Sequence, residues 1–313
     1  DLKDENGKKA QGEMTKWIHD EINTWITDQV KNSDEPFFAY YATPWPHAPL
    51  FVGEEFDGET GMGTYADCIT EFDYYLGQLF NTLESLGVMD DTIIVFTSDN
   101  GPALEGSTGE LRGGKYTAYE AGQKVPFMIR WGNGKLWKAG ETRKQSATIV
   151  DMMPTLVEMC GITGNGGKDK NYLPFDREID GVSMVNLLKN DTVIHTAEHP
   201  ILHMKREKLK AIQYTVPTAD ILKMDEYKNY TYPVLKDNKY ITFKYFKNIQ
   251  NDNIAFFDKF RKNWLHILTD DAGENLNRAK MYPTVADSMN AKMDDIMKDF
   301  KDNRRGINEE YYK

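Results

Sequence analysis

The chain has 313 residues and a formal net charge of −11, with 40% hydrophobic and 28% charged residues. This is the composition of an ordinary globular chain that can build a sizeable core, and the length permits one large domain or two moderate ones. The acidic balance argues against general nucleic-acid binding, which needs a basic surface. It also means that any site for an anion must be made positive locally. No apolar run reaches the roughly 20 residues of a membrane span, and the N-terminal D-L-K-D is not a signal peptide.

Predicted helices and strands alternate through the first hundred residues. Apolar side chains spaced three and four positions apart predict helices over residues 14–30 and 65–86, each with one buried stripe. Uninterrupted apolar runs over residues 37–42 and 92–96 predict strands that are buried on both faces. The order helix, strand, helix, strand is typical of an α/β domain with a parallel sheet.

Polar residues follow each of these two predicted strands. His47 lies in the proline-rich loop after the first, and Asp99 and Asn100 directly follow the second. Ligands of open α/β sheets bind beyond the carboxyl ends of the strands, and carboxylate and amide oxygens suit a hard cation such as calcium. Each observation has a simpler alternative. Asn100-Gly101 is also a common hairpin turn, and a lone histidine in such a loop is more often a solvated residue.

A glycine-rich connection over residues 102–124 contains Lys115. Its length and lack of periodicity favour a functional loop. It does not have the strand–loop–helix arrangement of a nucleotide phosphate loop, and a lysine in such a segment is usually just exposed. Taken together with His47, Asp99 and Asn100, however, Lys115 completes a set suited to holding and cleaving an anionic ester: a cation site, a positive charge and a titratable imidazole.

The remainder of the chain changes character after about residue 190. Residues 236–246 alternate polar and apolar side chains, which predicts a half-exposed antiparallel strand. We therefore divide the chain into an α/β domain over residues 1–190 and a smaller α+β subdomain over residues 191–313. The other predicted elements are a strand over 125–131, a helix over 147–159, a short apolar segment ending at 188 and a last helix over 285–300.

Several of these segments resemble sulfatase motifs. The two that carry the candidate site look like P-F-F-L-Y-x-A…H-x-P-L and F-T-S-D-N-G-P, and a third resembles G-G-K-x-x-x-x-E-G-G-x-R-V-P. The matching segments are, in chain order, Phe37–Ala42 with His47–Leu50, Phe96–Pro102, Gly113–Phe127, Asp151–Leu156 for D-x-x-P-T-L, and Asp180–Ser183 for D-G-x-S. The segments His199–Ile212 and Leu265–Glu274 resemble the C-terminal part of arylsulfatases more weakly.

The resemblance implies a formylglycine-dependent sulfatase with the alkaline-phosphatase-like fold, in which helices sandwich the sheet. In that family the residues matched by Asp99 and Asn100 bind calcium, and the lysine matched by Lys115 contacts the sulfate. The histidine matched by His47 contacts the sulfate and helps the leaving oxygen to depart. The residue types suit these roles, because positive charge stabilises the sulfate oxygens and a histidine titrates close to neutral pH.

The nucleophile of the family has no counterpart in this sequence. Sulfatases carry it in C-x-P-x-R, where the cysteine is oxidised to formylglycine, and neither Cys68 nor Cys160 has that context. We interpret both cysteines as small core residues. The leading aspartates of the calcium site are missing too, and these features belong to the N-terminal half of a sulfatase. We therefore expect this chain to be a C-terminal portion that is inactive alone and associates with the N-terminal half of the same protein.

Two alternatives stay open at this point. One is a phosphatase or phosphodiesterase of the same superfamily, although the Asp-Asn pair after the strand argues against it. The other is a non-catalytic binding protein that keeps the sulfatase surface without the nucleophile. The resemblance implies a location outside the cytoplasm, in the periplasm, a secretory route or a lysosome-like organelle. It leaves open which sulfate ester, from a small molecule to a glycan, is the substrate.

Overall fold

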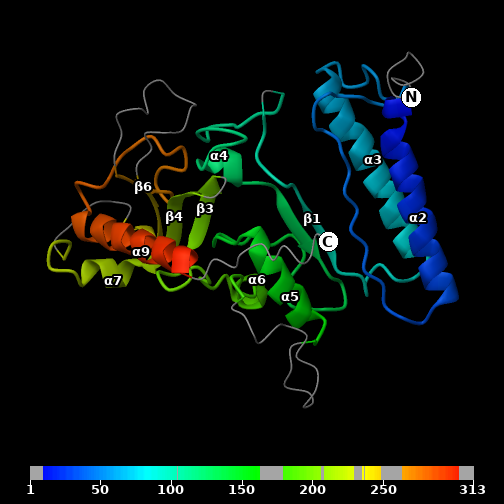
Figure 1. Ribbon diagram of the computed structural model, residues 1–313. Coiled ribbons are helices and arrows are strands. Elements are labelled where there is room, and N and C mark those ends of the chain that lie inside the picture. The colour runs from blue at the N-terminus through cyan, green and yellow to red at the C-terminus, as the bar shows by residue number, and fades with distance from the viewer. Residues whose placement is uncertain are drawn as a thin grey trace. The chain divides into compact units, whose positions relative to one another are not determined.

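The computed structural model describes residues 10–103, 105–162, 179–205, 208–228, 235, 237–247 and 263–302 (Figure 1). Their contacts divide the chain into two units, one formed by residues 1–95 and 128–135 and the other by residues 96–127 and 136–313. In the described part of the chain, no helix is both long and apolar enough to cross a membrane.

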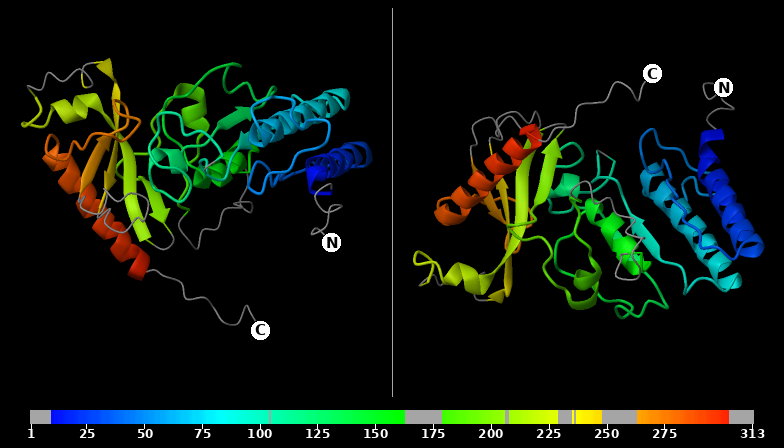
Figure 2. Two further views of the ribbon diagram at one scale, coloured as in Figure 1. Left: turned by 90° about the horizontal axis from the view of Figure 1, so that it is seen from above. Right: turned by 60° about the horizontal axis from the view of Figure 1, so that its bottom comes forward.

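The first unit is built on two long helices, α2 (Met14–Asn32) and α3 (Thr64–Ser85), which pack side by side (Figures 1 and 2). Both were predicted from their apolar spacing, and their shared core includes Ile26 and Leu83. Gly87 ends α3, because its φ of 73° is a conformation that glycine adopts without strain. The amide of Gly87 bonds back to the carbonyl of Glu84 and the amide of Val88 to that of Leu83, as in a Schellman motif.

The structure corrects the prediction of a buried strand over residues 37–42. The segment is extended, but it pairs with no strand among the described residues. Phe37 and Tyr41 pack on the helical core, whereas Phe38 and Tyr40 are 78% and 84% exposed. An apolar run favours extended backbone, but it does not state which partner strand or layer will cover the second face.

The strand before Asp99 is confirmed but is shorter and more exposed than expected. It is β1 (Ile94–Thr97), which pairs with β2 (Phe127–Arg130), the strand predicted over residues 125–131. All four residues of β1 are half-buried, so the prediction of burial on both faces is wrong for the described residues.

The second unit contains a four-stranded antiparallel sheet in the order β3-β4-β5-β6. Helix α9, the predicted last helix, lies across one face of this sheet (Figure 2). The core between them includes Phe243, Tyr245 and Met289. The bounds of these elements are β3 Ile201–Lys205, β4 Lys208–Pro217, β5 Tyr240–Phe246, β6 Trp264–Ile267 and α9 Pro283–Asp302.

The other face of the sheet carries polar side chains and is nevertheless buried. Strand register places Lys244 of β5 beside Gln213 of β4 and His266 of β6. All three side chains are buried, and Lys244 has no exposed surface. The prediction of a half-exposed strand was therefore right about the antiparallel pairing and the alternation, and wrong about exposure, because residues 112–123 cover this face.

The sulfatase-like segments Asp151–Leu156 and Asp180–Ser183 are hydrogen-bonded to each other through the buried carboxylate of Asp151. Helix α5 (Met152–Met159) follows a short 3₁₀ turn (Ile149–Asp151), and α6 (Val185–Asn190) packs near it. The Asp151 carboxylate accepts hydrogen bonds from the amides of Thr148 and Val182 and from Nε2 of His195, at 2.7, 2.8 and 2.8 Å. Asp151 is fully buried, so the D-x-x-P-T-L and D-G-V-S segments serve to hold this part of the fold together. Two other short helices in the described part of the chain are α4 (Glu120–Gln123) and α7 (Thr218–Leu222).

Candidate active site

The candidate cation ligands lie on the turn that follows β1. The carboxylate of Asp99 is exposed and has no hydrogen bond or ion pair to another described residue. The side-chain nitrogen of Asn100 donates to the carbonyl of Gly101 at 3.0 Å, which leaves its Oδ1 atom as the side-chain oxygen available to a ligand. The turn thus presents two oxygen donors that are not used within the described structure.

Backbone hydrogen bonds join this turn to the Lys115 loop. The amide of Gly101 donates to the carbonyl of Gly122 at 3.1 Å, and the amide of Lys115 donates to the carbonyl of Pro102 at 2.8 Å. The backbones approach so closely that a Cβ atom on Gly101 would lie 1.7 Å from the carbonyl oxygen of Ala121. The structure therefore brings together the Asp99–Asn100 turn and the Lys115 loop, and the roles of these residues stay a prediction.

Lys115 is a half-buried cation without a carboxylate partner among the described residues. Its Nζ atom lies 5.5 Å from the ring centroid of Tyr116, a residue that is 75% exposed. The tight turn before it uses Gly113 at a φ of 88°, where a Cβ atom would lie 2.4 Å from Oγ1 of Thr117. In a chain with a net charge of −11, this ammonium provides the local positive charge that an anion would need.

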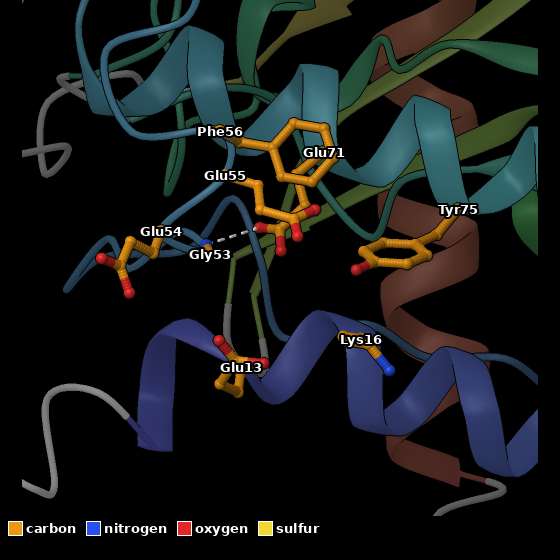
Figure 3. A pocket seen from close by; sticks show the side chains of 8 residues that line it. All are labelled: Glu13, Lys16, Gly53, Glu54, Glu55, Phe56, Glu71 and Tyr75. Atoms are coloured by element: carbon orange, nitrogen blue, oxygen red, sulfur yellow. Dashed lines mark hydrogen bonds between the residues drawn. The ribbon is translucent and has the colours of Figure 1, made fainter.

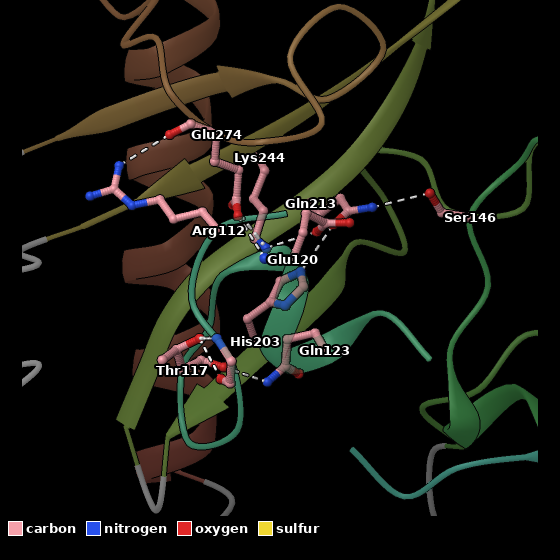
Figure 4. A network of polar contacts seen from close by, with 10 residues as sticks. Arg112, Thr117, Glu120, Gln123, Ser146, His203, Gln213, Lys244 and Glu274 are labelled. Atoms are coloured by element: carbon pink, nitrogen blue, oxygen red, sulfur yellow. Dashed lines mark hydrogen bonds and ion pairs between the residues drawn. The ribbon is translucent and has the colours of Figure 1, made fainter. Parts of the chain in front are cut away.

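A buried ion cluster anchors the Lys115 loop to the antiparallel sheet (Figure 4). Nζ of Lys244 lies 2.9 Å from Oε1 of Glu120 and 3.1 Å from Oε1 of Glu274. The second oxygen of Glu274 accepts the backbone amide of Glu120 at 2.6 Å. Burial raises the pKa of Glu274 to about 7, although the nearby Lys244 ammonium opposes this rise.

Local sequence patterns do not predict this cluster. The alternation in residues 236–246 places Lys244 on the polar face of its strand, and that signal favours an exposed lysine. Glu120 and Glu274 lie within segments that resemble sulfatase motifs, but nothing in either motif says that their carboxylates meet one lysine. Only the fold brings residues so distant in the chain together.

His47 belongs to the first unit, whereas Asp99, Asn100 and Lys115 belong to the second. Its side chain is exposed, and its Nδ1 atom lies 2.6 Å from the carbonyl oxygen of Ala48. If Nδ1 carries the proton and donates it to that carbonyl, Nε2 is left as the basic nitrogen. That atom is chemically suited to exchange a proton with a substrate, and its place in the site stays a prediction.

The donor set on the β1 turn fits calcium in kind but is only part of a full coordination shell. Calcium takes six to eight oxygen ligands at about 2.3–2.6 Å, and Asp99 and Asn100 supply one carboxylate and one amide oxygen. Among the described residues, no group of three or more histidine, cysteine, aspartate or glutamate side chains is placed to share a metal ion. The remaining ligands of a calcium ion here would therefore have to come from elsewhere.

The cysteines occupy different environments. Cys68 is buried in α3, where its Sγ atom lies 3.3 Å from the carbonyl of Phe51, and burial raises the pKa of its thiol to about 11. A thiol that stays protonated is a poor nucleophile. The interpretation of Cys68 as a core residue is confirmed. For Cys160 it is wrong, because this residue is exposed where α5 ends.

A pocket of about 470 Å³ in the first unit has the wrong charge for a sulfate (Figure 3). Its lining carries four carboxyl groups but only one ammonium, and His47 does not line it. The lining residues are Glu13, Lys16, Gly53, Glu54, Glu55, Phe56, Glu71 and Tyr75. Lys16 is itself engaged by Asp20 at 2.5 Å. Glu71 is buried, accepts one amide hydrogen bond from Gly53 at 3.3 Å, and has its pKa raised to about 7, chiefly by burial.

Comparison with known proteins shows similarity to sulfatases. The sulfatase family model matches residues 3–162, which is about half of the chain. An N-acetylgalactosamine-6-O-sulfatase of Bacteroides thetaiotaomicron is 40% identical over 144 residues, covering 40% of this chain and 28% of that protein. The human N-acetylgalactosamine-6-sulfatase is 31% identical over 212 residues, covering 66% of this chain and 38% of that protein.

Solved structures support the same fold. A sulfatase from a Bacteroides thetaiotaomicron study of glycosaminoglycan metabolism is similar with a TM-score of 0.64 and 25% identity, over 91% of this chain and 54% of that one. A sulfatase from Pseudoalteromonas sp. is similar in fold with a TM-score of 0.73 and 18% identity, over 94% of this chain and 54% of that one. The chain thus spans about half the length of these solved proteins and less than half of the curated relatives above.

The buried Glu71 carboxyl generates a prediction about stability. Its folded-state pKa of about 7 lies above the ordinary value of 4.5, so the folded state binds more protons between these pH values. Stability contributed by the protonated form is therefore complete below about pH 4.5 and is lost as pH rises through about 7. Glu71→Gln should raise the free energy of unfolding by up to about 3 kcal/mol at pH 8 and by clearly less at pH 5.

Chemical denaturation of the variant and the wild type at both pH values checks this expectation. Glu54→Gln is the matched control, because Glu54 lines the same pocket but is exposed, and it should change stability little at either pH. A Glu71→Gln variant that is equally or less stable than the wild type at pH 8 would contradict the conclusion that burial of the ionised Glu71 carboxylate destabilises the folded state.

Proposed function

Because the chain belongs to the sulfatase family, we propose that the protein that contains these residues hydrolyses sulfate esters, and that this chain supplies part of its calcium and sulfate site. The observation that carries the proposal is the pair of hydrogen bonds between the Asp99–Asn100 turn and the Lys115 loop. They hold two oxygen donors for a cation and an ammonium without a carboxylate partner on adjoining segments of one unit, and a divalent cation and a lysine are the groups that a sulfate dianion or ester would require.

Each residue has a role that follows from its chemistry. The Lys115 ammonium binds a sulfate oxygen and offsets negative charge as the sulfur–oxygen bond breaks. Asp99 and Asn100 would hold calcium, which would supply further positive charge to the site. His47, through the nitrogen that does not face the Ala48 carbonyl, gives a proton to the departing alcohol oxygen.

The nucleophile comes from outside these 313 residues in this proposal. Cys68 is buried with a raised thiol pKa, and Cys160 is followed by Gly161-Ile162 instead of the x-P-x-R context. A formylglycine on an N-terminal segment of the same protein would supply the attacking oxygen. This segment is the partner that we propose for the chain, and it would also bring the missing calcium ligands.

The substrate class that the relatives favour is a sulfated sugar. The relatives named above act, by their names, on N-acetylgalactosamine-6-sulfate groups. We therefore propose a glycan sulfate ester over a steroid or small aryl sulfate. We also propose a location outside the cytoplasm, as the resemblance to secreted, periplasmic and lysosomal sulfatases implies.

The divided site predicts how activity is distributed between two polypeptides. The chain purified alone should not hydrolyse an aryl sulfate in the presence of calcium, and addition of a segment that carries C-x-P-x-R, matured to formylglycine, should produce turnover. The control is the same segment without this chain. Activity of the chain alone would overturn the proposal for the nucleophile, and a mixture that hydrolyses phosphate esters but no sulfate ester would favour the phosphatase alternative.

Loss of the Lys115 ammonium should reduce turnover. Lys115→Ala in the complete enzyme is expected to lower kcat/KM for a sulfate ester by about a hundredfold or more, because a preorganised charge at the transition state is removed. Lys124→Ala is the matched control, since Lys124 is an exposed lysine that follows α4 in the same connection. A change of less than about threefold in Lys115→Ala would mean that Lys115 is an ordinary surface residue.

Loss of the Asp99 carboxylate should weaken calcium binding. Asp99→Ala in the complete enzyme is expected to require a higher calcium concentration for half-maximal activity and to lose nearly all turnover, because a charged oxygen ligand is removed. Isothermal titration with calcium and activity at graded calcium concentrations measure both effects. Glu105→Ala, which removes an exposed carboxylate nearby in sequence, should change neither; unaltered calcium dependence in Asp99→Ala would refute the assignment.

A further inference from the structure

We propose that Lys244 is a positioning residue for the proposed sulfatase site: through its buried ion pairs with Glu120 and Glu274 it holds the Lys115 loop in the geometry that binds sulfate. The inference rests on the proposed function, and it gives the antiparallel C-terminal sheet a role in the reaction. Lys244 lies on β5 of that sheet, and the loop it holds carries the candidate sulfate-binding lysine.

The charged side chains of the cluster are almost completely buried. The side chains of Lys244 and Glu274 have no exposed surface, and that of Glu120 is 13% exposed. A buried ammonium requires a nearby negative charge, and the two carboxylates that supply it come from the loop and from the segment after β6. Glu274 also binds the amide of Glu120 at 2.6 Å, so the start of α4 is attached to the sheet by side chain and backbone together.

Hydrogen bonds continue from this attachment to Lys115. In α4, the Gln123 side chain donates to the carbonyl of Thr117 at 2.8 Å, and the Thr117 hydroxyl donates to the carbonyl of Gly114, the residue before Lys115, at 2.8 Å. The amide of Lys115 then bonds to Pro102 on the turn that bears Asp99 and Asn100. A displacement of Glu120 is therefore transmitted to both candidate sulfate-binding and calcium-binding segments.

Apolar and cation–π contacts hold the same loop but do not replace the cluster. The ring of Tyr119 packs on Phe246 with 5.0 Å between the ring centroids, and the Arg112 guanidinium lies 4.6 Å from the Tyr119 ring centroid. Arg112 also donates to the backbone carbonyl of Glu274 at 3.2 Å. These contacts keep the loop on the sheet if the charge is removed, so a Lys244 variant can remain folded while the loop shifts.

A buried ion pair is weak evidence for a contribution to stability, because well-packed apolar side chains often stabilise a fold as much or more. Directional charge pairs constrain geometry more closely than apolar contacts do. In Lys244→Met the side chain keeps much of its length, and two buried carboxylates lose their shared cation. The expected consequence is a misplaced Lys115, because Glu120, which pairs with Lys244, is part of the loop that carries Lys115.

The test is a double-mutant cycle in the complete enzyme, at a temperature where circular dichroism shows every variant folded. Lys244→Met should lower kcat about tenfold or more for a sulfate ester while KM changes less than about threefold. In the Lys115→Ala background, Lys244→Met should lower kcat by less than about threefold, because the group it positions is gone. Lys244→Arg, which can bind both carboxylates, should recover most of the loss.

Lys247→Met is the matched control. Lys247 lies directly after β5, but its ammonium pairs with Asp294 of α9 on the sheet's other side, so kcat should be unchanged. If Lys244→Met does not fold, Glu120→Gln replaces it in the cycle, because it removes one charge from the partly exposed member of the cluster. An equal loss of kcat in both backgrounds, or no loss in either, would overturn the proposal.

Trypsin cleavage after Lys115 separates this inference from the proposed function. Cleavage there should become at least tenfold faster in Lys244→Met and remain unchanged in Lys247→Met, whatever the enzyme's substrate. Faster cleavage together with a wild-type enzyme that hydrolyses no sulfate ester would refute the function and keep Lys244 as the loop anchor. Unchanged cleavage would overturn the anchoring role itself.

Discussion

The buried ammonium of Lys244 constrains how the second unit is put together. A lysine without exposed surface is tolerated only where carboxylates compensate its charge, and removal of one partner from such a group typically costs about 3–5 kcal/mol. Glu120 and Glu274 meet this requirement only when residues 112–123 lie on the polar face of the sheet. The same requirement fixes the loop that presents Lys115 and, through backbone hydrogen bonds, the turn with Asp99 and Asn100.

The two faces of the antiparallel sheet therefore do different things. The face toward α9 is apolar and provides the main core, with Phe243, Tyr245 and Leu265 among its buried members. The opposite face, with Lys244 and Phe246, receives the glycine-rich loop. A loop with many glycines has a high conformational entropy when free, so the directional contacts of this second face are what give it a single geometry. In an acidic chain, the result is a lysine without a carboxylate partner among the described residues, on a loop hydrogen-bonded to the turn that carries the two proposed cation ligands.

How much of this could be predicted from the sequence depends on the range of the interactions. The long helices were predictable because their buried side chains recur at helical spacing along the sequence, as Leu79 and Leu83 of α3 do. The site turn and loop were predictable because their motifs resemble sulfatases. The exposure of Phe38 and the burial of Lys244 were not, because both depend on which distant segment covers a strand, and no local pattern contains that information. Asp151 is a different case: it lies in a sulfatase-like motif, and its hydrogen bonds to Val182 and His195 give it a structural role.

The most direct measurement of the central claim is native-state hydrogen exchange on the wild-type protein. If the cluster fixes the loop, the amides of Lys115, Glu120, Ala121 and Gly122 should open with nearly the same free energy as the amides of Phe243 and Tyr245 in β5, because loop and sheet then behave as one cooperative unit. Exchange of the loop amides about a thousandfold faster than those of β5, equivalent to about 4 kcal/mol, would contradict the account and show that the loop moves independently of the sheet.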